Sequence, residues 1–81
     1  MAGKPLFIVK AVKGTSKIKV AEARTEQEAI IKASEYVKAH KSELPEVWVL
    51  AWVSDRYKPR GYYQYDKKAK KFFYNLYSAM C

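Results

Sequence analysis

The spacing of apolar positions along the chain changes from two residues to three or four and then back to two. Residues 6–12 and 18–22 alternate apolar or β-branched side chains with polar ones, and the polar turn formers at 13–16 separate them. A spacing of two is typical of strands that expose one face to solvent. We therefore expect the chain to open with a β-hairpin.

A helix is predicted to begin after Thr25. Thr25 and Glu28 have the spacing of a capping box, in which the hydroxyl accepts from the amide three residues on and the carboxylate accepts from the amide of the capping residue. Apolar residues then recur every three or four positions, and Glu28 and Lys32 are spaced to pair on the opposite face. The helix should end near Lys41, because Pro45 disfavours helical backbone in the residue before it.

Residues 47–53 give the strongest strand signal and are apolar on both faces. Valine and alanine alternate on one face, while the other carries Trp48, Leu50 and Trp52. Because one face must cover the helix, the indoles are either core residues under a further layer or a candidate apolar interface for a partner. The following residues, 54–61, are rich in turn formers and cations and are expected to form a loop.

The last third of the chain permits two interpretations. Residues 62–65 and 71–77 are aromatic-rich and flank a lysine-rich stretch, which is typical of a hairpin. A helical stripe is the alternative, formed by Ala69, Phe72, Phe73, Leu76 and Met80. Aromatic composition favours the strands. The predicted fold is α+β: an antiparallel sheet of about five strands in the order ββαβββ with one amphipathic helix on one face, the alternative being ββαββα.

Length and composition indicate one small folded unit. With 81 residues, 49% of them hydrophobic and 30% charged, the chain is expected to form a single compact domain, 1–81, whose last few residues fray. No apolar run approaches the roughly 20 residues of a membrane span, and the single cysteine, Cys81, cannot form a disulfide within the chain. These features predict a cytoplasmic protein without membrane contact.

The formal charge of +8 is concentrated in two blocks. Five lysines and no acid lie between Lys4 and Lys19, and seven cations with one acid lie between Arg56 and Lys71, whereas all six glutamates lie between these blocks. Such a distribution favours polyanions or acidic protein surfaces as partners.

Residues that carry catalysis are scarce. His40 is the only histidine, so together with a single cysteine it cannot supply a zinc site or a nucleophile with its base. The three glycines are scattered and form no phosphate-binding loop. A metal-free ribonuclease would need a general base that this composition does not provide. We therefore expect no enzyme activity, no catalytic residue, no metal and no cofactor.

Cations and aromatic residues interleave in the second basic block. The candidate residues for contact with nucleic acid or a partner are Arg56, Tyr57, Lys58, Arg60, Tyr63, Lys67, Lys68, Lys70 and Lys71. Cations neutralise phosphates and tyrosine rings stack on bases, so the block predicts binding of DNA or RNA. In the alternative interpretation, the lysines keep a turn soluble and the tyrosines form cross-strand pairs.

The layout also resembles that of small phage anti-CRISPR proteins that place one helix on an antiparallel sheet. The resemblance rests on residues 7–11, 20–23, the capped start at 25–29 and the aromatic hairpin at 62–74. It implies a phage-encoded inhibitor that occupies a host protein or nucleoprotein complex in the bacterial cytoplasm. The strongly basic charge sets the chain apart from inhibitors that mimic nucleic acid. An open sheet face or edge would also allow a homodimer.

Overall fold

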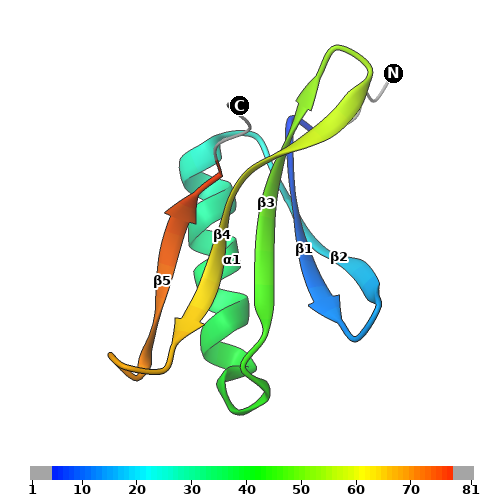
Figure 1. Cartoon of the computed structure of the whole chain (residues 1–81). Coiled ribbons are helices and arrows are strands. Elements are labelled where there is room, and N and C mark those ends of the chain that lie inside the picture. Colours follow the sequence, from blue (N-terminus) through cyan, green and yellow to red (C-terminus); the bar gives the residue numbers. More distant parts are fainter. Residues whose placement is uncertain (1–4, 78–81) are drawn as a thin grey trace.

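The structure is a computed structural model and describes residues 5–77, which form one five-stranded antiparallel sheet with a helix on one face (Figure 1). The spatial order is β2-β1-β3-β4-β5. The elements are β1 (Phe7–Lys13), β2 (Ser16–Ala23), α1 (Glu26–Ala39), a 3₁₀ turn (Lys41–Glu43), β3 (Glu46–Val53), β4 (Arg56–Asp66) and β5 (Lys71–Leu76). The α+β class is as predicted.

The two interpretations of the last third are also decided. Of the residues of the alternative C-terminal helix, Phe72, Phe73 and Leu76 lie in β5, which pairs with β4 along its whole length, and Ala69 lies in the turn before it. Met80 and the expected fraying of the last residues lie outside the described residues. Within residues 5–77, no helix is long and apolar enough to cross a membrane.

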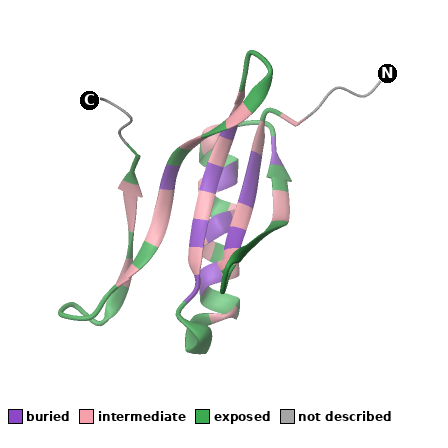
Figure 2. Ribbon diagram, turned by 45° about the vertical axis from the view of Figure 1, so that its right-hand side comes forward, coloured by how far each residue is buried: buried purple, intermediate pink, exposed green. Residues whose placement is uncertain are grey.

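Small side chains build the layer between the helix and the sheet. The buried residues of this layer are Val9 and Ala11 of β1, Ala23 of β2, Val47 and Val49 of β3, and Ala29, Ala33 and Val37 of α1 (Figure 2). Alanine and valine let the helix approach the strand backbone closely. All twelve aromatic residues lie in the described part of the chain, and none of them is fully buried. Five rings pack against the margins of this layer and remain partly exposed, namely those of Phe7, Tyr36, Tyr63, Phe72 and Tyr74.

The start of α1 is capped, although its bonds differ in part from the prediction. The Thr25 hydroxyl accepts from the Glu28 amide at 3.1 Å, as expected. The Glu28 carboxylate, however, accepts from the amide of Arg24 at 3.2 Å rather than from that of Thr25. Lys32 pairs with Glu28 at 3.5 Å. These bonds fix the path of the chain between the end of β2 and the start of α1.

The expectation of a loop over residues 54–61 is wrong, because β4 begins at Arg56. Only a tight turn separates β3 from β4, and Ser54 adopts a left-handed conformation there, with φ 62°. Pro59, which has no amide hydrogen to donate, is accommodated because it sits beyond the part of β4 that pairs with β5, which begins at Gly61. The cations of this segment thus lie on a strand.

Two β-bulges interrupt the alternation of the sheet. In β2, Val20 is an extra residue opposite the step from Val9 to Lys10. In β4, Arg60 is an extra residue opposite the step from Val49 to Leu50. Each bulge reverses the assignment of odd and even residues to the two faces. Pro59 and Tyr62 consequently point to the same side, away from the helix.

Gly61 provides the space that the Tyr74 ring of β5 occupies. A Cβ at position 61 would overlap the phenol end of Tyr74 and come within 2.8 Å of the Asn75 carbonyl oxygen. The Tyr74 hydroxyl is buried and has no hydrogen-bond partner among the described residues. Burial raises the pKa of Tyr74 to about 12, and the carboxylate of Glu26 adds to the effect.

We predict that Gly61→Ala destabilises the protein by about 1–3 kcal/mol, the usual cost of forcing atoms into filled space. Urea denaturation measures the change. Tyr74→Val should reduce this penalty, since it removes the ring that the new methyl group would strike. Equal penalties in the two backgrounds would show that the Tyr74 ring is not what limits the space at position 61.

A second prediction concerns acid. Because the Arg24 amide hydrogen-bonds to the Glu28 carboxylate and Lys32 lies beside it, the pKa of Glu28 is below its usual value of 4.5. The carboxylate therefore stabilises the fold above that value, and this contribution is lost as the pH falls below it. The melting temperature should drop less between pH 7 and pH 3 in Glu28→Gln than in the wild type. Identical drops would contradict this role.

Candidate functional site

Five aromatic side chains gather on the side of the sheet that the helix does not cover. We call this surface the aromatic face; it consists of Trp48, Trp52, Tyr57, Tyr62 and Tyr77. Trp48 and Tyr62 are cross-strand partners whose rings stack at 4.5 Å with 26° between their planes. Tyr77 meets Trp48 edge-on at 5.8 Å, and Tyr57 meets Trp52 at 4.9 Å. The rings form two clusters along β3.

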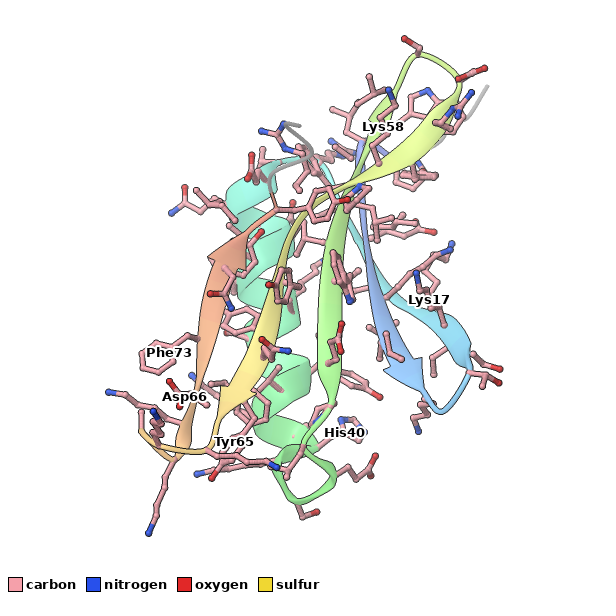
Figure 3. All side chains as sticks on the ribbon, in the orientation of Figure 1. Lys17, His40, Lys58, Tyr65, Asp66 and Phe73 are labelled. Atoms are coloured by element: carbon pink, nitrogen blue, oxygen red, sulfur yellow. The ribbon has the colours of Figure 1, made fainter. Side chains whose placement is uncertain are left out.

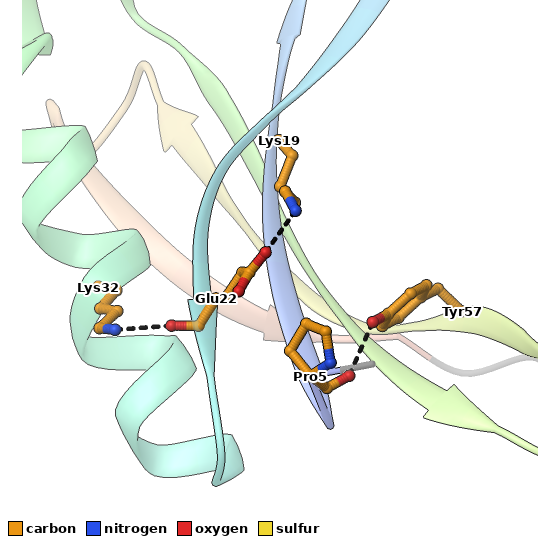
Figure 4. A network of polar contacts seen from close by, with 5 residues as sticks. All are labelled: Pro5, Lys19, Glu22, Lys32 and Tyr57. Atoms are coloured by element: carbon orange, nitrogen blue, oxygen red, sulfur yellow. Dashed lines mark hydrogen bonds and ion pairs between the residues drawn. The ribbon is translucent and has the colours of Figure 1, made fainter. Parts of the chain in front are cut away.

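Hydrogen bonds hold two of these rings in place. The Trp48 indole N–H donates to the Glu46 carboxylate at 2.6 Å, two residues away on the same strand. The Tyr57 hydroxyl donates to the Pro5 carbonyl oxygen at 2.7 Å, which fastens the segment before β1 to β4 (Figure 4). Little rotational freedom remains for these rings to lose when a ligand binds.

A cavity of about 210 Å³ opens beside Trp48. We call it the Trp48 pocket; its lining residues are Lys10, Lys17, Trp48, Leu50, Pro59 and Tyr77. Lys10 is the cross-strand neighbour of Trp48, and Lys17 reaches the pocket from β2 (Figure 3). The pocket therefore combines aromatic walls with two ammonium groups.

Some of the lysines near the pocket form ion pairs and others do not. Lys19 forms an ion pair with Glu22, which raises the pKa of Lys19 (Figure 4). Among residues 5–77, neither Lys10 nor Lys17 has an ion-pair partner. Glu46 is the acid nearest to the Trp48 ring and accepts the indole N–H. The two lysines remain available to an anionic ligand.

A second hollow of about 470 Å³ adjoins the pocket, because Pro59 and Tyr77 line both. Lys58 and Arg60 also line it. The Arg60 guanidinium lies 3.2 Å from the Glu26 carboxylate and is thus engaged with the helix. Lys58 pairs with Ala51 and therefore lies on the side of the sheet opposite to Trp48, so the cations that line the pocket are Lys10 and Lys17.

The structure divides the basic block that the sequence presents as continuous. Lys58 and Asp66 lie toward opposite ends of β4 (Figure 3), an 11-residue strand roughly 33 Å long. Arg56 lies beside Asp55 at 3.3 Å at the β3–β4 turn. The other cluster consists of Lys67, Lys68, Lys70 and Lys71 around the β4–β5 turn. Of the candidate cations, only Lys58 and Arg60 line the hollow that adjoins the Trp48 pocket.

Hydrogen bonds of Asp66 shape the β4–β5 turn that carries the second group of lysines. The Asp66 carboxylate accepts from the amides of Lys68 at 2.8 Å and Ala69 at 3.3 Å, which shapes the turn. The Lys71 ammonium lies 5.3 Å from the centre of the Phe73 ring. These lysines are exposed and can add to the long-range field, but none of them lines the Trp48 pocket.

Among the predicted aromatic residues, Tyr63 lies on the other side of the sheet. It packs against the core beside Tyr74, with ring centres 5.1 Å apart, and burial raises its pKa. Trp48 and Trp52 are both half-buried on the open face, so neither lies in the layer under the helix. Tyr57 shares this face with them.

Six residues of the site were not among the predicted candidates: Lys10, Lys17, Leu50, Pro59, Tyr62 and Tyr77. Lys10 lies two residues after Ile8 on the open side of β1, and its contact with Trp48 depends on the β1–β3 register. Strand alternation alone could have placed Lys10 on the face of Ile8. The identity of its cross-strand neighbour has no signal in the sequence.

The acidic residues, His40 and the ligand-bearing side chains of the described residues do not gather into a metal site. Within the described residues, no three His, Cys, Asp or Glu side chains lie close enough together to hold a metal ion. The His40 ring stacks on Tyr36 at 4.0 Å, and its Nδ1 lies 3.1 Å from the Tyr36 carbonyl oxygen. His40 therefore completes the end of α1.

Comparison of the chain with protein-family models, with curated proteins and with solved structures finds no significant match in any of the three. The functional assignment accordingly rests on the chemistry of the aromatic face.

The lysines beside Trp48 should be detectable by fluorescence quenching. In a Trp52→Phe background, iodide should quench Trp48 more strongly than caesium at low salt, because Lys10 and Lys17 concentrate anions near the indole. Replacing both lysines with glutamine should reduce the iodide quenching constant roughly twofold. Acrylamide, which is neutral, controls for exposure and should quench all forms equally. If the iodide quenching constant is the same with and without the two lysines, their ammonium groups do not lie near the Trp48 ring.

Proposed function

We propose that the protein is a non-enzymatic nucleic-acid-binding protein whose binding surface is the aromatic face together with its flanking cations. The observation that carries the proposal is the Trp48 pocket, where two lysines without ion-pair partners border aromatic walls. Ammonium groups neutralise phosphates, and aromatic rings contact bases and sugars. A nucleic acid carries phosphates for the ammonium groups and bases for the aromatic rings, so it matches both parts of the surface.

The overall charge supports the same function. With sixteen basic and eight acidic residues, the chain attracts polyanions from a distance. The exposed lysines at the β4–β5 turn add to this attraction. Contact with the aromatic face then supplies the short-range interaction.

A second candidate function is that of an anti-CRISPR-like inhibitor encoded by a phage and acting in the bacterial cytoplasm. It is favoured by the apolar share of the aromatic face, to which Leu50 and Pro59 contribute along with the indoles. Such an inhibitor would bind a host protein or nucleoprotein complex through this face. The two functions differ in their response to salt, since phosphate contacts weaken steeply as ionic strength rises and apolar contacts do not.

A matched pair of charge variants tests the proposal. The double variant Lys10→Gln with Lys17→Gln removes two cations from the aromatic face, and Lys38→Gln with Lys41→Gln removes two from the helix and the turn after it. Binding of a labelled random-sequence oligonucleotide should weaken on the order of 20-fold at 0.1 M salt in the first variant only. Fluorescence anisotropy measures the affinity.

The salt dependence gives a second readout. The slope of log affinity against log salt should become shallower by about 1.5 in the aromatic-face variant, because two phosphate contacts are lost. Circular dichroism verifies that both variants are folded. Equal losses in the two variants would show that only net charge matters, and the absence of any binding by the wild type would overturn the function itself.

A further inference from the structure

Building on the proposed function, we infer that the ligand is single-stranded and that the Trp48 pocket receives one unpaired base. The inference deepens the assignment from nucleic acid in general to a strand whose bases are free to turn toward the protein. It follows from the shape of the pocket, the width of the sheet and the positions of two cations.

The pocket has the walls that a flat ring requires. Trp48 and Tyr77 stand at its sides, and the Trp48 ring is held by Glu46 and by stacking on Tyr62. Leu50 and Pro59, paired across β3 and β4, contribute apolar surface. Such a site accepts the face of any base, because every base has an aromatic face to stack.

The pocket is small in comparison with sites that enclose a whole ligand. At about 210 Å³, the cavity is smaller than the roughly 300–1,000 Å³ of pockets that hold drug-sized molecules. A single heterocyclic base matches this scale better than a whole nucleotide. The sugar and phosphate would therefore remain at the rim, where Lys10 and Lys17 stand.

A duplex does not fit the same surface. Five strands span about 19 Å across the sheet, whereas the major groove of B-form DNA is only about 12 Å wide and admits a helix or a two-stranded ribbon. The bases of a duplex are moreover stacked on one another, so contact between a base and Trp48 would first require the duplex to unstack locally. An undistorted duplex could contact the lysines but not Trp48.

The cations mark a path for the backbone of a single strand. Lys17 of β2 and Lys10 of β1 both line the pocket on the side of β1. A strand that crosses the sheet from β2 toward β4 would meet these two cations before its base reaches the pocket. This order of contacts needs a flexible backbone.

The test compares oligonucleotides on the wild-type protein. One is a single-stranded random-sequence 12-mer, the second has the same backbone with every base removed, and the third is the matching duplex. The normal single strand should bind roughly 5- to 150-fold more tightly than the abasic strand, the range that stacking of one base provides. Deoxyribose and ribose versions of the first strand determine whether DNA or RNA is preferred.

Variants locate the base. Trp48→Leu should remove most of the difference between normal and abasic strands, whereas Trp52→Leu, four residues along the same face and outside the pocket, should retain it. If Trp48→Leu does not fold by circular dichroism, Tyr77→Leu replaces it, since Tyr77 is 43% exposed at the edge of the pocket.

The outcomes separate this inference from the function on which it rests. Equal binding of normal and abasic strands, or tighter binding of the duplex, would overturn the inference and leave the proposed binding of nucleic acid intact. Failure of every oligonucleotide to bind would overturn both. Loss of the difference in Trp52→Leu but not in Trp48→Leu would place the base elsewhere and so contradict the assignment of the pocket.

Discussion

The close contact between α1 and the sheet constrains the rest of the molecule. Its buried layer consists of alanine and valine, and the largest fully buried side chains are Val9, Val47 and Val49. A layer built from such small groups brings the helix near the strands, and the aromatic rings that contact it, such as Tyr63 and Phe72, remain partly exposed. It also buries little apolar area for each residue, so its share of the stability is limited. The remaining stabilisation has to come from outside this layer.

The aromatic residues supply it through contacts with one another. Trp48 with Tyr62, Trp52 with Tyr57, and Tyr65 with Phe72 are all cross-strand neighbours with ring centres between 4.5 and 5.2 Å apart. Such pairs contribute about 0.5–1.5 kcal/mol each beyond the area they bury. The rings of the aromatic face thus hold the sheet together and form the candidate binding surface at the same time. Stability and binding cannot be varied independently there.

Much of the fold follows from local sequence patterns. Thr25 and Glu28 mark the start of the helix, and the two-residue alternation predicts the opening hairpin because such signals depend only on near neighbours. The C-terminal hairpin follows from aromatic composition in the same way. The segment 54–61 was misassigned because Pro59 and Gly61 are turn formers by composition, while here a bulge and an unpaired strand edge accommodate them. Local composition carries no information on these conditions.

The site was less predictable than the fold, for a physical reason. The candidates were drawn from residues that are close in sequence, but β4 separates Lys58 from Lys67 by most of its length. Conversely, Lys10 and Trp48 are distant in sequence and become neighbours only through the β1–β3 register. Register is decided by the whole sheet packing on α1. The two indoles were identified because both faces of β3 are apolar, a property visible within one strand.

The bulge at Arg60 has a consequence for how this surface could change during evolution. Tyr62 and Pro59 share the aromatic face because the bulge takes up one extra residue between the two regular stretches of β4. Loss of that single codon would restore strict alternation and leave Pro59 and Tyr62 on the same side, because the pairs Leu50–Pro59 and Val49–Gly61 would then follow one another directly. The surface would therefore survive a deletion at position 60. A deletion elsewhere in β4 that kept the bulge would instead exchange the two faces of one part of the strand.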